Sequence, residues 1–297
     1  MQKRFAKTRS LHPSDAVQGF GISQQAFCNA KWSLYIRRHC LPLLSTPFEL
    51  QNDFSVAILG LSKFFREDAA VTAQTMLIGN RSCRIYGEPH AEHLLLQMTG
   101  EHELQGIGHE VTVIAQSSWN FLFAAVPVES WNDALSPWEA PAVWGKQGFG
   151  GKAGNTLRFL TEQVIPALKQ QFALPENVQI ILGGYSLAGL FALWASTQTA
   201  LFSDVATASP SVWFPGWMEF EQQHPMQTQH IYLSLGDKEE HTKNAVMAAV
   251  GDNIRTLHSR LAERGTDCTL EWNSGGHFKD ADLRTARAFQ WVMEESR

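Results

Sequence analysis

The sequence has few cysteines and no long hydrophobic run. Only four of the 297 residues are cysteines, and no two of them have the Cys-x-x-Cys spacing of a zinc site or redox motif. We therefore expect reduced thiols rather than a disulfide framework at Cys28, Cys40, Cys83 and Cys268. The longest apolar stretch, residues 54–65, is about 12 residues long and too short to cross a bilayer.

Charge is also scarce, at 18% of the residues, and the net charge is −5. The chain therefore has no overall basic field that would attract a nucleic acid, and we expect neither a nucleic-acid nor a membrane partner. No apolar segment follows the basic first ten residues, so we expect no secretory signal and a cytoplasmic location.

The charge is unevenly distributed along the chain. Residues 1–70 hold nine lysines and arginines against five acidic residues, whereas the remainder holds 15 against 24. We predict an accessory or poorly ordered extension over residues 1–72 and a larger domain over residues 73–297.

Short apolar runs alternate with helical patterns from about residue 73 onward. Strands are predicted at residues 75–78, 83–86, 93–98, 121–128, 178–182, 205–209, 231–235 and 268–272. Helices are predicted at residues 102–116, 157–168, 187–196, 246–261 and 283–292, with a long loop over residues 129–154. This alternation predicts an α/β fold: a doubly wound, mostly parallel sheet with helices on both faces.

One strand runs directly into a helix with a serine at the corner. The segment Gly184-Tyr185-Ser186-Leu187-Ala188 has small residues two positions before and after the serine, as a nucleophile elbow requires. Alanine takes the place of the last glycine of the usual Gly-x-Ser-x-Gly pattern but is also small. The alternative interpretation is simple close packing between strand and helix.

A nucleophilic serine needs an imidazole base and a carboxylate that orients it, and in this fold the order is Ser, acid, His. His277 is the histidine that follows the last predicted strand, in a Gly-Gly-His-Phe loop. The acid is expected after the strand at 231–235, where Asp237, Glu239 and Glu240 compete. We favour Glu239, with Asp237 second, because about three loop residues are needed to reach the histidine.

Two other patterns are weaker. His90 and His93 form a His-x-x-His, but the pair lies between strands rather than on a helix, so we expect no metal and no cofactor. Residues 148–153 are rich in glycine, yet they follow no strand and have Ala153 where a phosphate-binding loop needs serine or threonine, which argues against a nucleotide site.

With these motifs in place, residues 73–297 resemble the putative-esterase family of α/β-hydrolases, which includes esterase D-like and enterobactin-esterase-like enzymes. The resemblance also rests on Trp131–Trp138, Phe149–Gly151 and Ser209–Trp213. It implies a serine esterase acting on a small-molecule ester, and it supports Glu239 as the acid. Residues 1–70 show no such resemblance.

The mechanism expected for such an enzyme requires an oxyanion hole and a pocket. We expect one oxyanion donor from the backbone of Leu187 and a second from Thr99 or its neighbours Met98 and Gly100. Aromatic residues of the 129–154 loop and beyond are expected either to line the pocket, with Trp138 and Trp213 contacting substrate, or to anchor the loop. Two rival functions stay open: an acyltransferase using the same residues, and a non-catalytic binding protein.

Overall fold

A computed structural model describes residues 73–101, 103–117 and 120–296. The predicted extension over residues 1–72, with Cys28 and Cys40, lies outside the described residues. In the described part of the chain, no helix is long and apolar enough to cross a bilayer. The cytoplasmic location stays a prediction.

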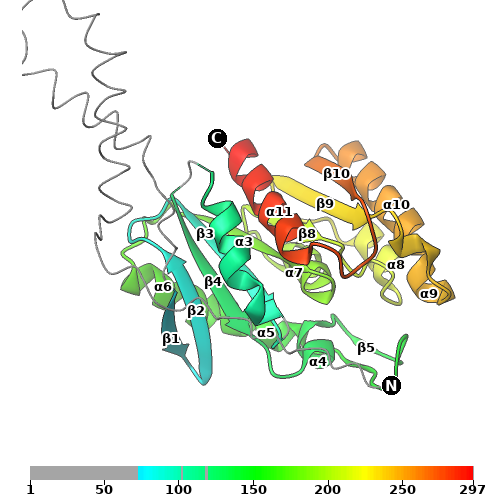
Figure 1. The fold of residues 1–297 in the computed structure, drawn as a ribbon, viewed down its shortest axis with the longest axis horizontal. Coiled ribbons are helices and arrows are strands. Elements are labelled where there is room, and N and C mark those ends of the chain that lie inside the picture. Colours follow the sequence, from blue (N-terminus) through cyan, green and yellow to red (C-terminus); the bar gives the residue numbers. More distant parts are fainter. Residues whose placement is uncertain (1–72, 102, 118–119, 297) are drawn as a thin grey trace, which may run out of the picture. The chain divides into compact units, whose positions relative to one another are not determined.

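An eight-stranded sheet forms the centre of the domain (Figure 1). Its strand order is β1-β2-β4-β3-β7-β8-β9-β10, and all neighbours from β4 to β10 run parallel. The antiparallel β1 and β2, both predicted as strands, form a hairpin at one edge. The strands are β1 (Gln74–Ile78), β2 (Arg81–Gly87), β3 (His93–Thr99), β4 (Phe121–Pro127), β7 (Gln179–Tyr185), β8 (Asp204–Ala208), β9 (His230–Gly236) and β10 (Asp267–Asn273).

Helices cover both faces of this sheet because its central strands are apolar on both sides. In β3, Leu94 and Leu96 pack into the core on one face and Leu95 into the core on the other. The first face is covered by α5 (Ala153–Phe159), α6 (Ile165–Gln171), α7 (Leu187–Gln198) and α10 (Val250–Glu263). The second is covered by α3 (Ile107–Ile114) and α11 (Ala281–Glu295), which lie in front of the sheet in Figure 1. The predicted doubly wound, mostly parallel fold is confirmed.

Several helix boundaries differ from the sequence prediction. The helix expected at 102–116 begins only at Ile107, after a 3-10 turn over Glu103–Gln105. The one expected at 246–261 is two helices, α9 (Ala245–Ala248) and α10, which are separated at Ala249. The side chain of Asn244 accepts hydrogen bonds from two amides of α9 and caps the start of that helix. The helix expected at 157–168 contains a π-helical turn over Leu160–Val164, just before Pro166.

The chain after β8 and the long loop contain short elements that were not predicted. Helix α8 (Trp217–Gln223) follows Gly216, and the 129–154 segment contains α4 (Trp131–Leu135), β5 (Glu139–Ala140) and β6 (Phe149–Gly150). Trp217 and Glu221 of α8 are buried one helical turn apart. Arg260 and Arg264 of α10 pair with the Glu221 carboxylate, which explains how a glutamate can be buried there.

Candidate active site

Ser186 occupies the sharp turn between β7 and α7. Its backbone has φ 58° and ψ −121°, a conformation that a serine adopts only when the surrounding structure enforces it. The Ser186 amide donates to the carbonyl of Ala208, and its carbonyl accepts from the amide of Ser211. The end of β8 and the segment just after it therefore hold the backbone of this strained turn through both its amide and its carbonyl.

The small residues around this turn are sterically required. A Cβ atom on Gly184 would lie 2.7 Å from Cβ of Ala188, so alanine at 188 is tolerated because 184 is glycine. A Cβ on Gly189 would lie 3.1 Å from Cβ of Pro210. The helix can approach the strand this closely only because residues 184 and 189 have no side chain. The close packing and the sharp turn at Ser186 therefore depend on the same small residues.

The loop after β10 brings His277 to Ser186. Nε2 of His277 lies 3.0 Å from Oγ of Ser186, and Nδ1 lies 2.6 Å from Oε2 of Glu239. When the proton is on Nδ1 and forms a hydrogen bond to the carboxylate, Nε2 is unprotonated and can accept the serine proton. The hydroxyl of Tyr185 donates to the backbone carbonyl of His277 and ties the loop to the end of β7.

Glu239 is held through its other carboxylate oxygen. Oε1 accepts hydrogen bonds from the Gly236 amide at 2.8 Å and the Ser209 hydroxyl at 2.6 Å, and it lies 3.2 Å from the Arg284 guanidinium. Burial alone would raise the pKa of Glu239, but the bonds from His277, Ser209 and Gly236 outweigh it and lower the pKa below its ordinary value. The carboxylate is therefore ionised at neutral pH.

The two competing acids have other partners. Asp237 accepts a hydrogen bond from the Gly275 amide and so holds the histidine loop through its backbone. Glu240 pairs with Arg255 at 2.8 Å, and that pairing lowers the pKa of its carboxyl. Of the three acids expected after β9, the structure brings Glu239 alone to the imidazole.

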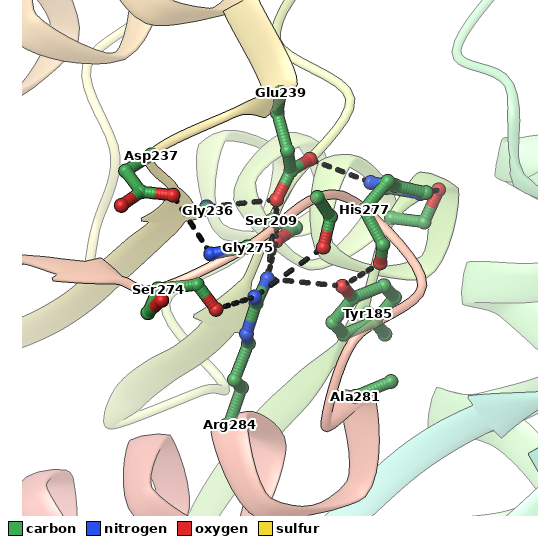
Figure 2. A network of polar contacts seen from close by, with 12 residues as sticks. Tyr185, Ser209, Gly236, Asp237, Glu239, Ser274, Gly275, His277, Ala281 and Arg284 are labelled. Carbon is green, nitrogen blue, oxygen red and sulfur yellow. Dashed lines mark hydrogen bonds and ion pairs between the residues drawn. The ribbon is translucent and has the colours of Figure 1, made fainter.

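Arg284 joins the site from α11 and was not among the residues predicted from the sequence (Figure 2). Its side chain is 1% exposed, and it extends from the helix toward Glu239 and Tyr185. A signal was present in the sequence, because Arg284 shares the apolar face of its helix with Ala288 and Phe289. A charge on such a face needs a buried partner.

The expected oxyanion donors are only partly placed. Leu187 is the first residue of α7, where amides have no partner within the helix. The Gly100 amide donates to the Glu103 carboxylate at 2.9 Å, so it is already engaged. The Thr99 carbonyl accepts from Val128, and its buried hydroxyl has no partner among the described residues. Thr99 as second donor stays a prediction.

The two tryptophans predicted to contact substrate have different surroundings. Trp138 donates from Nε1 to the Pro215 carbonyl at 2.9 Å and packs against Phe214 and Phe220, contacts that anchor its loop. Trp213 is half-buried and follows Ser211, whose Oγ lies 3.4 Å from that of Ser186. The contacts of Trp138 are those of a loop anchor, whereas Trp213 lies close along the chain to Ser211, whose hydroxyl neighbours that of Ser186.

The family pattern described as putative esterase matches residues 123–280, more than half of the chain. The chain belongs to the putative-esterase family. This family membership confirms the predicted resemblance and the class of carboxylic ester hydrolase. The matched range includes Ser186, Glu239 and His277 but ends before Arg284. No curated protein sequence matches the chain.

Solved structures show the same fold at low sequence identity. An IroE-like serine hydrolase from Shewanella oneidensis is 14% identical with a TM-score of 0.65, covering 76% of this chain and 81% of its own. The siderophore hydrolase EstA from Aspergillus nidulans is 17% identical with a TM-score of 0.59, covering 77% and 95%. The enterobactin esterase of Shigella flexneri is 13% identical with a TM-score of 0.52, covering 76% and 60%. The α/β-hydrolase fold of this esterase is thereby established.

The described residues also bear on the weaker sequence patterns. Between 73 and 296, apart from residues 102, 118 and 119, no three histidine, cysteine or acidic side chains gather as metal ligands. His90 Nδ1 instead contacts the Ala173 carbonyl. Cys83 is a buried free thiol, whereas Cys268 is free but only half-buried.

Proposed function

We propose that this protein is a serine esterase that forms an acyl-enzyme on Ser186. The observation that carries the proposal is the chain of two contacts, Ser186 Oγ to His277 Nε2 and His277 Nδ1 to Glu239. A serine hydroxyl is a weak nucleophile on its own, and this arrangement supplies the base and the carboxylate that orients it.

In the first step, Oγ of Ser186 attacks the ester carbonyl carbon while its proton moves to Nε2 of His277. The carbonyl electrons move onto oxygen, and the amide of Leu187 with a second amide near Thr99 stabilises this oxyanion. Each such donor lowers the barrier by about 3–4 kcal/mol. The tetrahedral intermediate then collapses, and the imidazolium gives its proton to the departing alcohol.

In the second step, water attacks the acyl-enzyme and His277 takes its proton, so that the carboxylic acid leaves and Ser186 is restored. Glu239 stays ionised throughout and stabilises the transient imidazolium. The substrate is a small-molecule ester. Siderophore hydrolases among the structures of similar fold make siderophore esters one class to assay beside short acyl and aromatic esters.

Replacement of the serine tests the proposal. Ser186→Ala is expected to abolish hydrolysis of a short-chain p-nitrophenyl ester and labelling by a fluorophosphonate, with an unchanged melting temperature. Ser196→Ala is a matched control, because Ser196 is a buried serine of α7, the helix that follows Ser186, and its hydroxyl bonds only the Leu193 carbonyl of that helix. Turnover retained by Ser186→Ala would refute the proposal.

Product analysis separates hydrolysis from acyl transfer. With an added alcohol acceptor, a hydrolase releases mainly the free acid, whereas an acyltransferase releases mainly the new ester. Wild-type protein that neither turns over any ester nor reacts with the fluorophosphonate would instead support the non-catalytic binding protein.

A further inference from the structure

The guanidinium of Arg284 joins the two loops that carry the acid and the base. It is the seventh residue after His277 and lies in the first turn of α11. One terminal nitrogen lies 3.2–3.4 Å from three oxygens: Glu239 Oε1, Ser209 Oγ and Tyr185 OH. The other lies 3.4 Å from the backbone carbonyl of Ser274, which Figure 2 shows, and 3.3 Å from that of Gly276, the residue before the histidine.

A buried arginine is expensive unless its charge and its donors are satisfied. Here Glu239 supplies the opposite charge, and the planar guanidinium directs its two nitrogens at two different loops. A leucine or methionine at this position would pack on the apolar face of the helix without burying a charge. An arginine there therefore indicates a requirement that packing alone does not impose.

We propose that Arg284 is a positioning residue for the esterase reaction. It holds Oε1 of Glu239 so that Oε2 faces Nδ1 of His277, and it holds the backbone from which His277 extends. This inference rests on the proposed function, because it concerns how the acid and the base of that reaction are aligned.

A second route connects Arg284 to the histidine. The Tyr185 hydroxyl accepts a hydrogen bond from the guanidinium and donates one to the His277 carbonyl. Burial raises the pKa of Tyr185 to about 12, so the phenol keeps the proton with which it bonds the His277 carbonyl. Arg284 thus fixes the histidine both through Glu239 and through the backbone carbonyl.

The charge of Arg284 has a measurable consequence. The groups facing the site are Glu239 and Asp237 after β9, His277 after β10, Tyr185 at the end of β7, and Arg284 itself on α11. Arg284 is the cation of this set, and its guanidinium, 3.2 Å from Oε1 of Glu239, favours the ionised form of that carboxylate. Its removal should shift the acidic limb of the kcat/KM profile upward.

The experiment compares Arg284→Met and Arg284→Lys with wild type. A small misalignment of catalytic groups can lower turnover about 100-fold, so Arg284→Met should lose about that much kcat with little change in KM. Its acidic limb should move upward, and the deshielded proton NMR signal of the short Nδ1–carboxylate hydrogen bond should weaken or vanish. Arg284→Lys restores a charge near Glu239 but cannot reach both loops, so its pH profile should stay near wild type while kcat remains reduced.

The control is Arg260→Met, which breaks the ion pair with buried Glu221 between α10 and α8. It should lower stability but leave kcat and the pH profile unchanged. Should Arg284→Met fail to fold, the lysine variant alone decides through its kcat. Wild-type kcat, pH profile and NMR signal in a folded Arg284 variant would overturn the inference. Loss of activity in Ser186→Ala under the same conditions would show that the proposed function itself still holds.

Discussion

Oδ1 of Asp237 accepts a hydrogen bond of 2.7 Å from the backbone amide of Gly275. The Lys238 amide returns a bond to the Gly275 carbonyl, so the loop after β9 and the loop after β10 are joined at their bases. The first acidic residue after β9, Asp237, thereby supports the backbone, and the second, Glu239, contacts the imidazole. This division of roles allows the acid assignment to be tested by substitution.

Glu239→Gln and Asp237→Asn should differ strongly in turnover. The glutamine cannot hold His277 in the required tautomer or stabilise its charge, so kcat should fall, by up to about 10⁴-fold. The asparagine oxygen can still accept from the Gly275 amide, so Asp237→Asn should keep kcat within about tenfold, since one neutral hydrogen bond replaces a charge-assisted one. Steady-state kinetics on a p-nitrophenyl ester gives both numbers. Equal losses in the two variants would contradict the assignment of Glu239.

The contact between Gly184 and Ala188 predicts a steric defect. Gly184→Ala places its Cβ 2.7 Å from that of Ala188, so the elbow must open. We expect the free energy of unfolding to fall by about 1–3 kcal/mol, and kcat to fall because Ser186 moves from Nε2 of His277. Chemical denaturation and ester kinetics measure the two effects.

Gly154→Ala is the matched control for this substitution. Gly154 lies in α5, and nothing lies within 4 Å of an added Cβ. Alanine there should leave kcat unchanged and stabilise the protein by about 0.5–1 kcal/mol, because glycine is unfavourable in a helix. If both variants behaved alike, the steric account of the elbow would be wrong.

The sequence was sufficient for features that depend on local pattern. Continuous apolar runs predicted β3, β4 and β7, and the small residues around Ser186 predicted its turn. Features that depend on distant partners were not predictable. Glu221 is buried because Arg260 and Arg264 approach it from another helix, and Arg284 is buried because four separate segments of the chain meet there.

The predicted helix boundaries were wrong where the helix is interrupted within a continuous apolar pattern. The spacing of Val246, Val250 and Ile254 fits one helix, but Asn244 caps a single turn and the chain re-enters helix at Val250. The choice among Asp237, Glu239 and Glu240 had a similar limit. All three follow the same strand, and only the three-dimensional path of the histidine loop distinguishes their partners.

Two tryptophans of the 129–154 segment should respond differently to truncation. Trp138→Ala removes the bond to the Pro215 carbonyl and the packing on Phe214 and Phe220, so stability should fall by between about 1 and 3 kcal/mol. Trp144 is 79% exposed, and Trp144→Ala should change stability by no more than about 0.5 kcal/mol. Urea denaturation of both variants provides the comparison. A stable Trp138→Ala with a raised KM would instead favour direct substrate contact.

Glu110 of α3 should make stability depend on pH. Its carboxyl is buried. Among the described residues, the one hydrogen bond to this carboxyl comes from Gln97 at 3.3 Å, and no lysine or arginine pairs with it. Burial raises its pKa well above the ordinary 4.5, so the folded protein keeps a proton that the unfolded chain releases. The contribution of protonated Glu110 to the free energy of unfolding is complete below pH 4.5, and it is lost as the pH rises through the pKa of the folded state.

Glu110→Gln should remove this dependence, because the amide has a similar shape and does not titrate. The difference in unfolding free energy between variant and wild type should grow with pH, by up to about 1.4 kcal/mol per unit, in favour of the variant. Urea denaturation from pH 5 to pH 9 measures it, and Glu263→Gln, at an exposed position of α10, should show no such trend. A difference that stays constant with pH would mean that Glu110 is ionised in the folded protein, and a buried cation or water not implied by its neighbours would then have to stabilise it.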